Sequence, residues 1–144
     1  MYVKELTLPA AVESIPQITE WVNTELQRLD CPAKAKIHID IAIDEIVSNI
    51  AHYAYGAAAG SLTVQAEVQH QPPAITLMFI DSGTPFNPLE FAEPDISVPL
   101  QERGVGGLGI FLVKKTMDAV TYRYADGQNR LTIQKSWKGD GTTI

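Results

Sequence analysis

Residues 43–55 read IDEIVSNIAHYAY, and this stretch decides how the rest of the chain is interpreted. Its polar residues Glu45, Asn49 and His52 are spaced at i, i+4 and i+7, so they share one stripe of a helix. The isoleucines fall on a second stripe: Ile39, Ile43, Ile46 and Ile50. A carboxylate and an amide one turn apart can orient a nucleophile and hold a hard cation through oxygen. The alternative is the solvated polar edge of an amphipathic helix.

The composition favours one domain that binds a small ligand or a protein. The chain has 144 residues, 45% of them hydrophobic, which is enough for one buried core and too few for two ordinary domains. The net charge of -6, without a Lys/Arg cluster, argues against a nucleic-acid surface. We expect a cytoplasmic protein, because neither a signal-peptide pattern nor a membrane-spanning apolar run is present. The single cysteine, Cys31, excludes an internal disulfide and a Cys-based zinc site.

Hydrophobic periodicity predicts five strands and three helices around this stretch. The expected strands cover residues 2–8, 62–68, 74–80, 119–125 and 130–137, and the expected helices cover 15–29, 33–55 and a segment that opens at the glycines after residue 103. Because the strands come mainly as hairpins, we predict an α+β fold. This is a two-layer α/β sandwich whose mixed, mostly antiparallel sheet is covered on one face by helices. Residues 82–103 contain four prolines and no clear periodicity, which is typical of a binding loop or a lid.

Asp81 ends the apolar strand 74–80 and is a candidate ligand-binding residue. A carboxylate in such a place is costly unless a donor binds it, and the amino group of adenine is one such donor. The alternative is that Asp81 caps its own turn before Gly83.

Three glycines, Gly104, Gly106 and Gly109, match the dinucleotide-binding pattern G-x-G-x-x-G. A Rossmann fold requires a strand just before them and a parallel strand after the helix, whereas here a Pro-rich loop precedes and a hairpin follows. A glycine-rich turn into a helix still exposes unpaired N–H groups that suit phosphate. Alternatively, the glycines only permit a turn or close packing.

Together the three segments resemble the GHKL ATPase superfamily of gyrase, Hsp90, histidine kinases and MutL. The resemblance covers nearly the whole chain and is greatest to the anti-sigma-factor serine kinases of the RsbW and SpoIIAB kind. Glu45 and Asn49 match the N box of that family, and Asp81 and Gly83 match its first glycine box. The second glycine box corresponds to Gly104, Gly106, Gly107 and Gly109.

The resemblance implies that the chain binds ATP and Mg²⁺ (the Bergerat ATP-binding fold), and it assigns roles to individual residues. Asp81 would bind the adenine N6 with Gly83 close by, and the second glycine box would bind the nucleotide as well. Asn49 would ligate Mg²⁺ that bridges the phosphates, and Glu45 would act as the general base.

Two further residues and a segment receive roles from the same resemblance. Thr132 would lie near adenine, Arg103 near the γ-phosphate, and residues 84–103 would form the ATP lid. The sequence also departs from the family pattern NxxxHAY, because Tyr53 stands at the usual His position and His52 falls one residue early. This leaves His52 without an assigned role: it is either a polar group that helps to orient Asn49 or Glu45, or a structural histidine, and we favour the second. In the motif DxGxPFDP, Asn87 replaces the second Asp.

The implied function is a protein serine/threonine kinase that phosphorylates a STAS-domain, anti-anti-sigma-like partner and forms a homodimer. A non-catalytic, nucleotide-gated module that sequesters a sigma factor or another regulator is the alternative. Glu45 favours catalysis, because ATP can be held without a base. A detached ATP domain of a histidine kinase would need a phosphoacceptor histidine on a dimerisation helix. His38, His52 and His70 do not have that setting.

Overall fold

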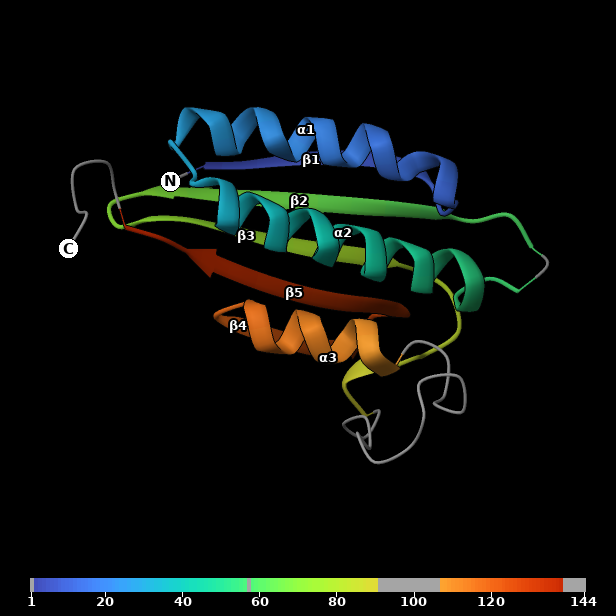
Figure 1. Cartoon of the computed structure of the whole chain (residues 1–144). Coiled ribbons are helices and arrows are strands. Elements are labelled where there is room, and N and C mark those ends of the chain that lie inside the picture. The colour runs from blue at the N-terminus through green and yellow to red at the C-terminus, as the bar shows by residue number, and fades with distance from the viewer. Residues whose placement is uncertain (1, 57, 91–106, 139–144) are drawn as a thin grey trace.

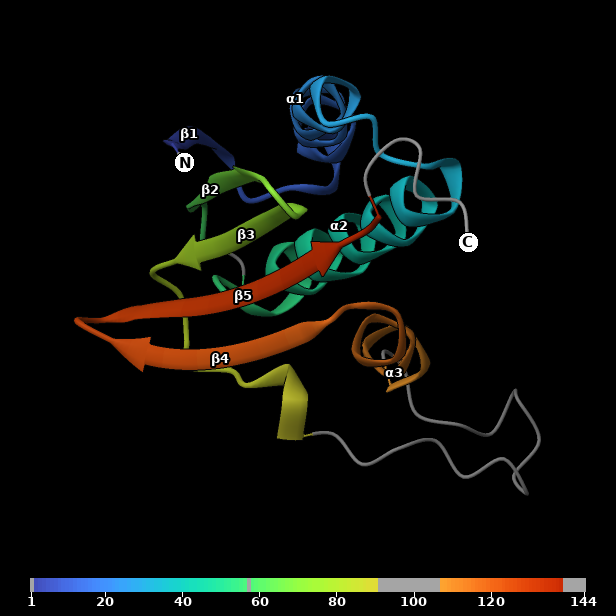
Figure 2. The ribbon, with the colours of Figure 1, turned by 90° about the vertical axis from the view of Figure 1, so that its left-hand side faces the viewer.

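Alternating apolar and polar residues build five strands that pair into one sheet (Figures 1 and 2). The computed structural model describes residues 2–56, 58–90 and 107–138. Within them the strand order is β1-β2-β3-β5-β4 and every pairing is antiparallel. The strands are β1 (Tyr2–Pro9), β2 (Ser61–His70), β3 (Pro73–Asp81), β4 (Ala119–Ala125) and β5 (Gln128–Ser136). All five predicted strands are confirmed, and the described sheet is wholly antiparallel where a mixed sheet was expected.

Three α-helices lie on one face of this sheet (Figure 2). They are α1 (Ile15–Arg28), α2 (Ala33–Tyr53) and α3 (Gly107–Thr116), and two short 3-10 helices are η1 (Val12–Ser14) and η2 (Pro88–Glu90). The two-layer α+β architecture predicted from the sequence is therefore confirmed. No helix among the described residues is long and apolar enough to cross a membrane.

The core lies between the sheet and α2, the longest helix. Ile39, Ile43 and Ile46 of α2 and Phe79 of β3 are buried, as their spacing on one helix stripe and one strand face predicts. Burying an aliphatic or aromatic side chain stabilises a fold by about 1.5–3 kcal/mol, so this stripe anchors α2 firmly. The polar stripe of the same helix is thereby directed to one fixed place on the molecule.

The hairpin of β4 and β5 closes the far edge of the sheet. Its turn contains Asp126 and Gly127, both with positive φ, which matches the predicted turn at Gly127. Because this hairpin follows α3 directly, the described sheet lacks the parallel strand that a dinucleotide-binding fold requires.

Candidate nucleotide-binding site

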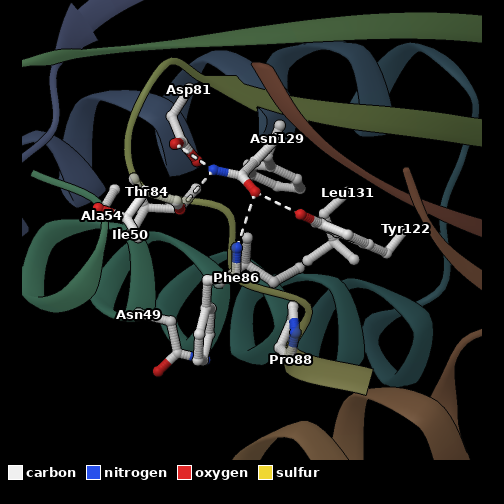
Figure 3. A pocket seen from close by; sticks show the side chains of 12 residues that line it. Asn49, Ile50, Ala54, Asp81, Thr84, Phe86, Pro88, Tyr122, Asn129 and Leu131 are labelled. Atoms are coloured by element: carbon white, nitrogen blue, oxygen red, sulfur yellow. Dashed lines mark hydrogen bonds between the residues drawn. The ribbon is translucent and has the colours of Figure 1, made fainter. Parts of the chain in front are cut away.

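A cavity of about 30 Å³ lies where the second half of α2 meets the end of β3 and the start of β5 (Figure 3). Its apolar lining includes Ile46, Ile50, Phe79 and Leu131. Its polar lining residues are Asn49, Asp81, Thr84, Tyr122 and Asn129. The fold therefore brings the predicted N-box amide and the predicted adenine-binding carboxylate to one cavity, although they are 32 positions apart in the sequence.

Asp81 is a buried carboxylate with 5% of its surface exposed. Its Oδ1 accepts a hydrogen bond from the Gly83 N–H over 2.9 Å and another from Asn129 Nδ2 over 2.9 Å. The turn-capping role considered from the sequence is thus present. Oδ1 accepts both of these hydrogen bonds, and Oδ2 accepts neither. A buried carboxylate oxygen gains from a donor, so the arrangement suits a ligand that brings an amino group.

Gly83 fixes the turn after Asp81 against the end of α2. A Cβ atom at Gly83 would lie 2.1 Å from the carbonyl oxygen of Ala54, and the next residue, Thr84, donates its N–H to that same oxygen over 2.7 Å. Only glycine allows this approach without a shift of the backbone. Gly83 therefore positions Asp81 through the turn, as we expect of a residue close to the adenine base.

Glu45 and Asn49 are joined by a hydrogen bond across one turn of α2. Asn49 Nδ2 donates to Glu45 Oε2 over 3.2 Å. Burial raises the pKa of the half-buried Glu45 carboxyl, the Asn49 hydrogen bond acts in the opposite direction, and the Asp44 charge raises the pKa further. A carboxylate with a raised pKa is a better proton acceptor, which suits a general base.

The first turn of α3 packs directly on Glu45. A Cβ atom at Gly109 would lie 2.0 Å from Glu45 Oε1, so any larger residue there would displace the Glu45 carboxylate. Gly107 begins α3. The helix start predicted to meet the phosphates therefore lies beside the predicted base. Arg103, Gly104 and Gly106 lie outside the described residues, as does the part of the predicted lid from residue 91 onward.

The beginning of the predicted lid is held in place by several contacts. The Phe86 N–H donates to Asn129 Oδ1 over 3.0 Å, and its ring stacks on Tyr53 with 5.4 Å between ring centroids. Asn87 Oδ1 accepts from the Leu89 N–H, which starts η2. His52 is exposed, its ring lies 6.2 Å from that of Tyr53 between centroids, and its Nδ1 lies 2.8 Å from the carbonyl oxygen of Ser48 one turn earlier.

Thr132 does not line the cavity. It pairs with Met78 and lies on the face of β5 opposite to Leu131 and Ile133, which point into the core. Asn129 occupies the neighbouring position on the inner face, directly opposite Asp81 in the register. The alternation of inward and outward residues along β5 is the sequence signal that could have identified Asn129, since it puts Asn129 on the same face as Leu131 and Ile133.

The residues around the cavity fit an adenine nucleotide in chemistry, whereas the cavity is small. A volume of about 30 Å³ is smaller than a purine ring, and Thr84, Phe86 and Pro88 of the segment after β3 line the cavity. For a cation, Asn49 Oδ1 is the free oxygen. The described residues include no group of three or more His, Cys, Asp or Glu side chains able to hold a metal ion. A cation here would need oxygens from phosphate or water as further ligands.

The sequence matches the family described as histidine kinase-like ATPase domain over residues 8–135. The chain belongs to this family. Membership in this family implies that the domain binds ATP.

Curated relatives of this ATPase domain carry protein kinase names. The serine/threonine-protein kinase BtrW of Bordetella bronchiseptica is 24% identical over 113 residues, which cover 78% of this chain and 79% of that protein. The serine-protein kinase RsbW of Halalkalibacterium halodurans is 28% identical over 127 residues, covering 85% and 76%. The serine-protein kinase RsbW of Bacillus mycoides is 24% identical over 131 residues, covering 88% and 81%.

A solved structure shares the fold. A crystal structure of the RsbU and RsbW domains of a Mycobacterium tuberculosis protein superimposes with a TM-score of 0.66 at 15% identity. The match covers 96% of this chain and 34% of that chain. Together with the family match, this confirms the resemblance stated from the sequence.

Proposed function

We propose that this chain is an ATP-dependent protein serine/threonine kinase of the anti-sigma-factor type, which phosphorylates a STAS-domain partner in a partner-switching pathway. The observation that carries the proposal is the Glu45–Asn49 pair, in which a carboxylate of raised pKa is hydrogen-bonded to the amide that borders the cavity. ATP can be bound without such a base, so its presence supports phosphoryl transfer over binding alone. The kinase names of the relatives support the same reaction.

In this proposal each group has a separate task. Asp81 would bind the adenine ring at the cavity, and Asn49 would hold the cation through its Oδ1. Mg²⁺, when bound, neutralises the charge that develops on the phosphates. Glu45 accepts the proton of the partner's serine or threonine hydroxyl as its oxygen attacks the γ-phosphorus of ATP, while the bond from that phosphorus to the β–γ bridging oxygen breaks and ADP leaves. The first turn of α3, which packs on Glu45, offers backbone N–H groups at the positive end of a helix dipole.

A nucleotide-gated binding module that sequesters a sigma factor or another regulator is the second candidate. Thr84 and Phe86 line the cavity, so a nucleotide bound there would contact the segment after β3. Through this contact a nucleotide could alter the surface beside α2. This candidate needs no proton acceptor, so it leaves Glu45 without a task.

A homodimer in the cytoplasm, without a nucleic-acid or membrane partner, completes the proposal. No helix among the described residues covers the outer face of the sheet (Figure 2), where Met78 and Ile80 lie in the middle. Arg123 and Arg130 stand on that face in β4 and β5, and Glu67 stands in β2. Two copies packed face to face about an axis along the strands would place the acidic side over the basic side. Sedimentation equilibrium at low and high salt tests this, with a monomer at both contradicting it.

The direct test of the kinase proposal uses the purified chain with Mg-ATP and each STAS-domain protein encoded in the same genome. We expect one of these proteins to gain a single phosphoserine or phosphothreonine, detected by intact mass and peptide mapping. If the chain binds ADP yet phosphorylates none of them, and still captures a regulator in a nucleotide-dependent way, the binding module is the correct function.

A further inference from the structure

Asn129 uses both ends of its amide within the candidate site (Figure 3). Its Nδ2 donates to Asp81 Oδ1 over 2.9 Å and to the carbonyl oxygen of Thr84 over 3.0 Å. Its Oδ1 accepts from the Phe86 N–H over 3.0 Å and from the Tyr122 hydroxyl. The Phe86 N–H can only donate and the Thr84 carbonyl can only accept. The neighbours therefore fix which end of the amide faces Asp81.

This orientation determines which oxygen Asp81 offers to a ligand. Oδ1 is occupied by Asn129 and by the Gly83 N–H, so a rotation of the carboxylate would break two hydrogen bonds. Oδ2 remains as an acceptor at the cavity, of which Asp81 and Asn129 are both lining residues. An acceptor held in one place favours a purine with an amino group at C6. It disfavours one with a carbonyl there, which would leave two acceptors facing each other.

We propose that Asn129 is a positioning residue that sets the preference of this site for 6-aminopurine over 6-oxopurine nucleotides by holding Asp81 in one orientation. The inference rests on the proposed function in one respect, namely that Asp81 binds the base. It adds a residue of β5 that neither the sequence motifs nor the family match assigns. Asn129 does not act as a proton donor or acceptor in the phosphoryl transfer.

The same amide also joins the base-binding carboxylate to the segment that closes the cavity. The bonds to Thr84 and Phe86 reach that segment, whereas the bonds to Asp81 and Tyr122 run between neighbouring strands of the sheet. The two bonds between strands do not involve this segment. Asn129 therefore contacts Asp81 through a bond that does not depend on where the segment lies.

The first test compares ADP with IDP, which carries a carbonyl at C6, by isothermal titration. We expect the parent to prefer ADP, and Asn129→Ala to lower the ratio of ADP to IDP affinity about tenfold or more, since a correctly oriented polar contact gives most of the discrimination. Gln128→Ala is the matched control. It removes the amide of the adjacent residue, whose Oε1 accepts a hydrogen bond from Arg130 and which lies on the other face of β5. The control should keep the parental ratio.

A second variant keeps the proposal testable if Asn129→Ala does not fold. Asn129→Asp preserves the shape and the oxygen that faces Phe86 and Tyr122, but it replaces the donor to Asp81 by a second carboxyl oxygen. Two carboxyl groups at this distance share a proton, so the ADP affinity of this variant should fall as the pH rises from about 5.5 to about 8.5. The ADP affinity of the parent should change much less. A merely structural role would lower the melting temperature without creating this dependence.

The outcomes separate this inference from the proposed function. Folded Asn129 variants with the parental ADP-to-IDP ratio and the parental pH profile would overturn the positioning role, as would a parent that binds ADP and IDP equally. A parent that binds neither nucleotide overturns both proposals. If the ratio and the pH profile change as expected while no STAS protein is phosphorylated, the positioning role stands and the kinase proposal fails.

Discussion

Asn49 donates a hydrogen bond from Nδ2 to Oε2 of Glu45 across one turn of α2, with 3.2 Å between the two atoms. A carboxylate can only accept, so the bond fixes the amide with Nδ2 toward Glu45 and leaves Oδ1 as its free acceptor. Oδ1 of Asn49 is therefore the oxygen available to a cation, and the carboxylate of Glu45 is oriented by Asn49. The two residues should respond differently to substitution.

Asn49→Ala should lower the affinity for Mg-ATP far more than the affinity for ATP in the presence of a chelator. The amide oxygen acts on the cation, so its loss leaves the contacts to the base unchanged. Titration calorimetry with and without Mg²⁺ measures both affinities. An equal loss under the two conditions would show that Asn49 supports the helix or the cavity wall instead.

Asp81→Asn should weaken ADP binding by about 1–3 kcal/mol, because the side chain then presents an N–H group where the adenine amine needs an acceptor. The new amide can still accept from Gly83 and Asn129 through its oxygen, so the fold should persist. Asp126→Asn, in the exposed turn between β4 and β5, is the control for the loss of one charge. Unchanged ADP affinity in the folded Asp81 variant would remove the adenine assignment.

Gly83→Ala and Gly109→Ala should have different effects, although both positions lack room for a methyl group. At Gly83 the methyl group meets the backbone carbonyl of Ala54, which cannot move alone, so we expect a loss of about 1–3 kcal/mol in the free energy of unfolding. At Gly109 it meets the flexible end of Glu45. That variant should stay nearly as stable as the parent while the displaced carboxylate loses its function. Chemical denaturation measures both stabilities, and the reverse order would contradict the packing described here.

Glu45→Gln should be more stable than the parent at neutral pH. Burial raises the pKa of Glu45 in the folded state, so the fold disfavours the ionised form. The resulting penalty is present above the folded pKa, shrinks as the pH falls through it, and vanishes below the unfolded pKa. Thermal unfolding at neutral pH and under acidic conditions should show a difference that disappears in acid. A difference that is constant with pH would mean that burial of the charge does not cause it.

The sequence predicted the architecture well because the apolar residues repeat with clear periods. The isoleucine stripe of α2 and the alternation along β2 leave few alternatives, and the two segments fold as expected. The end of α2 came two residues earlier than predicted, at Tyr53, whose ring instead stacks on Phe86. Such a contact depends on a residue 33 positions away and has no local sequence signal.

The candidate site was only partly predictable for the same reason. Glu45, Asn49 and Asp81 could be named as candidate site residues because local geometry decides their positions: the first two lie one helical turn apart, and Asp81 lies at the end of a strand. Asn129 has its meaning only through the pairing of β5 with β3, which puts it opposite Asp81. The choice of Thr132 came from the family pattern without a test of which strand face it occupies. The packing of α3 on Glu45 also required the tertiary structure.

The central claim is that Glu45 serves as the base for phosphoryl transfer to a protein hydroxyl. The most direct measurement is the single-turnover rate of transfer from Mg-ATP to the cognate STAS protein by the parent and by Glu45→Gln, with Asp44→Asn as the control for the exposed neighbouring carboxylate. We predict that Glu45→Gln binds Mg-ATP about as well as the parent and transfers about 10²–10⁴ times more slowly, because a base acts on the nucleophile and not on the nucleotide. Asp44→Asn should transfer at nearly the parental rate. A Glu45→Gln protein that phosphorylates its partner as fast as the parent would contradict the account.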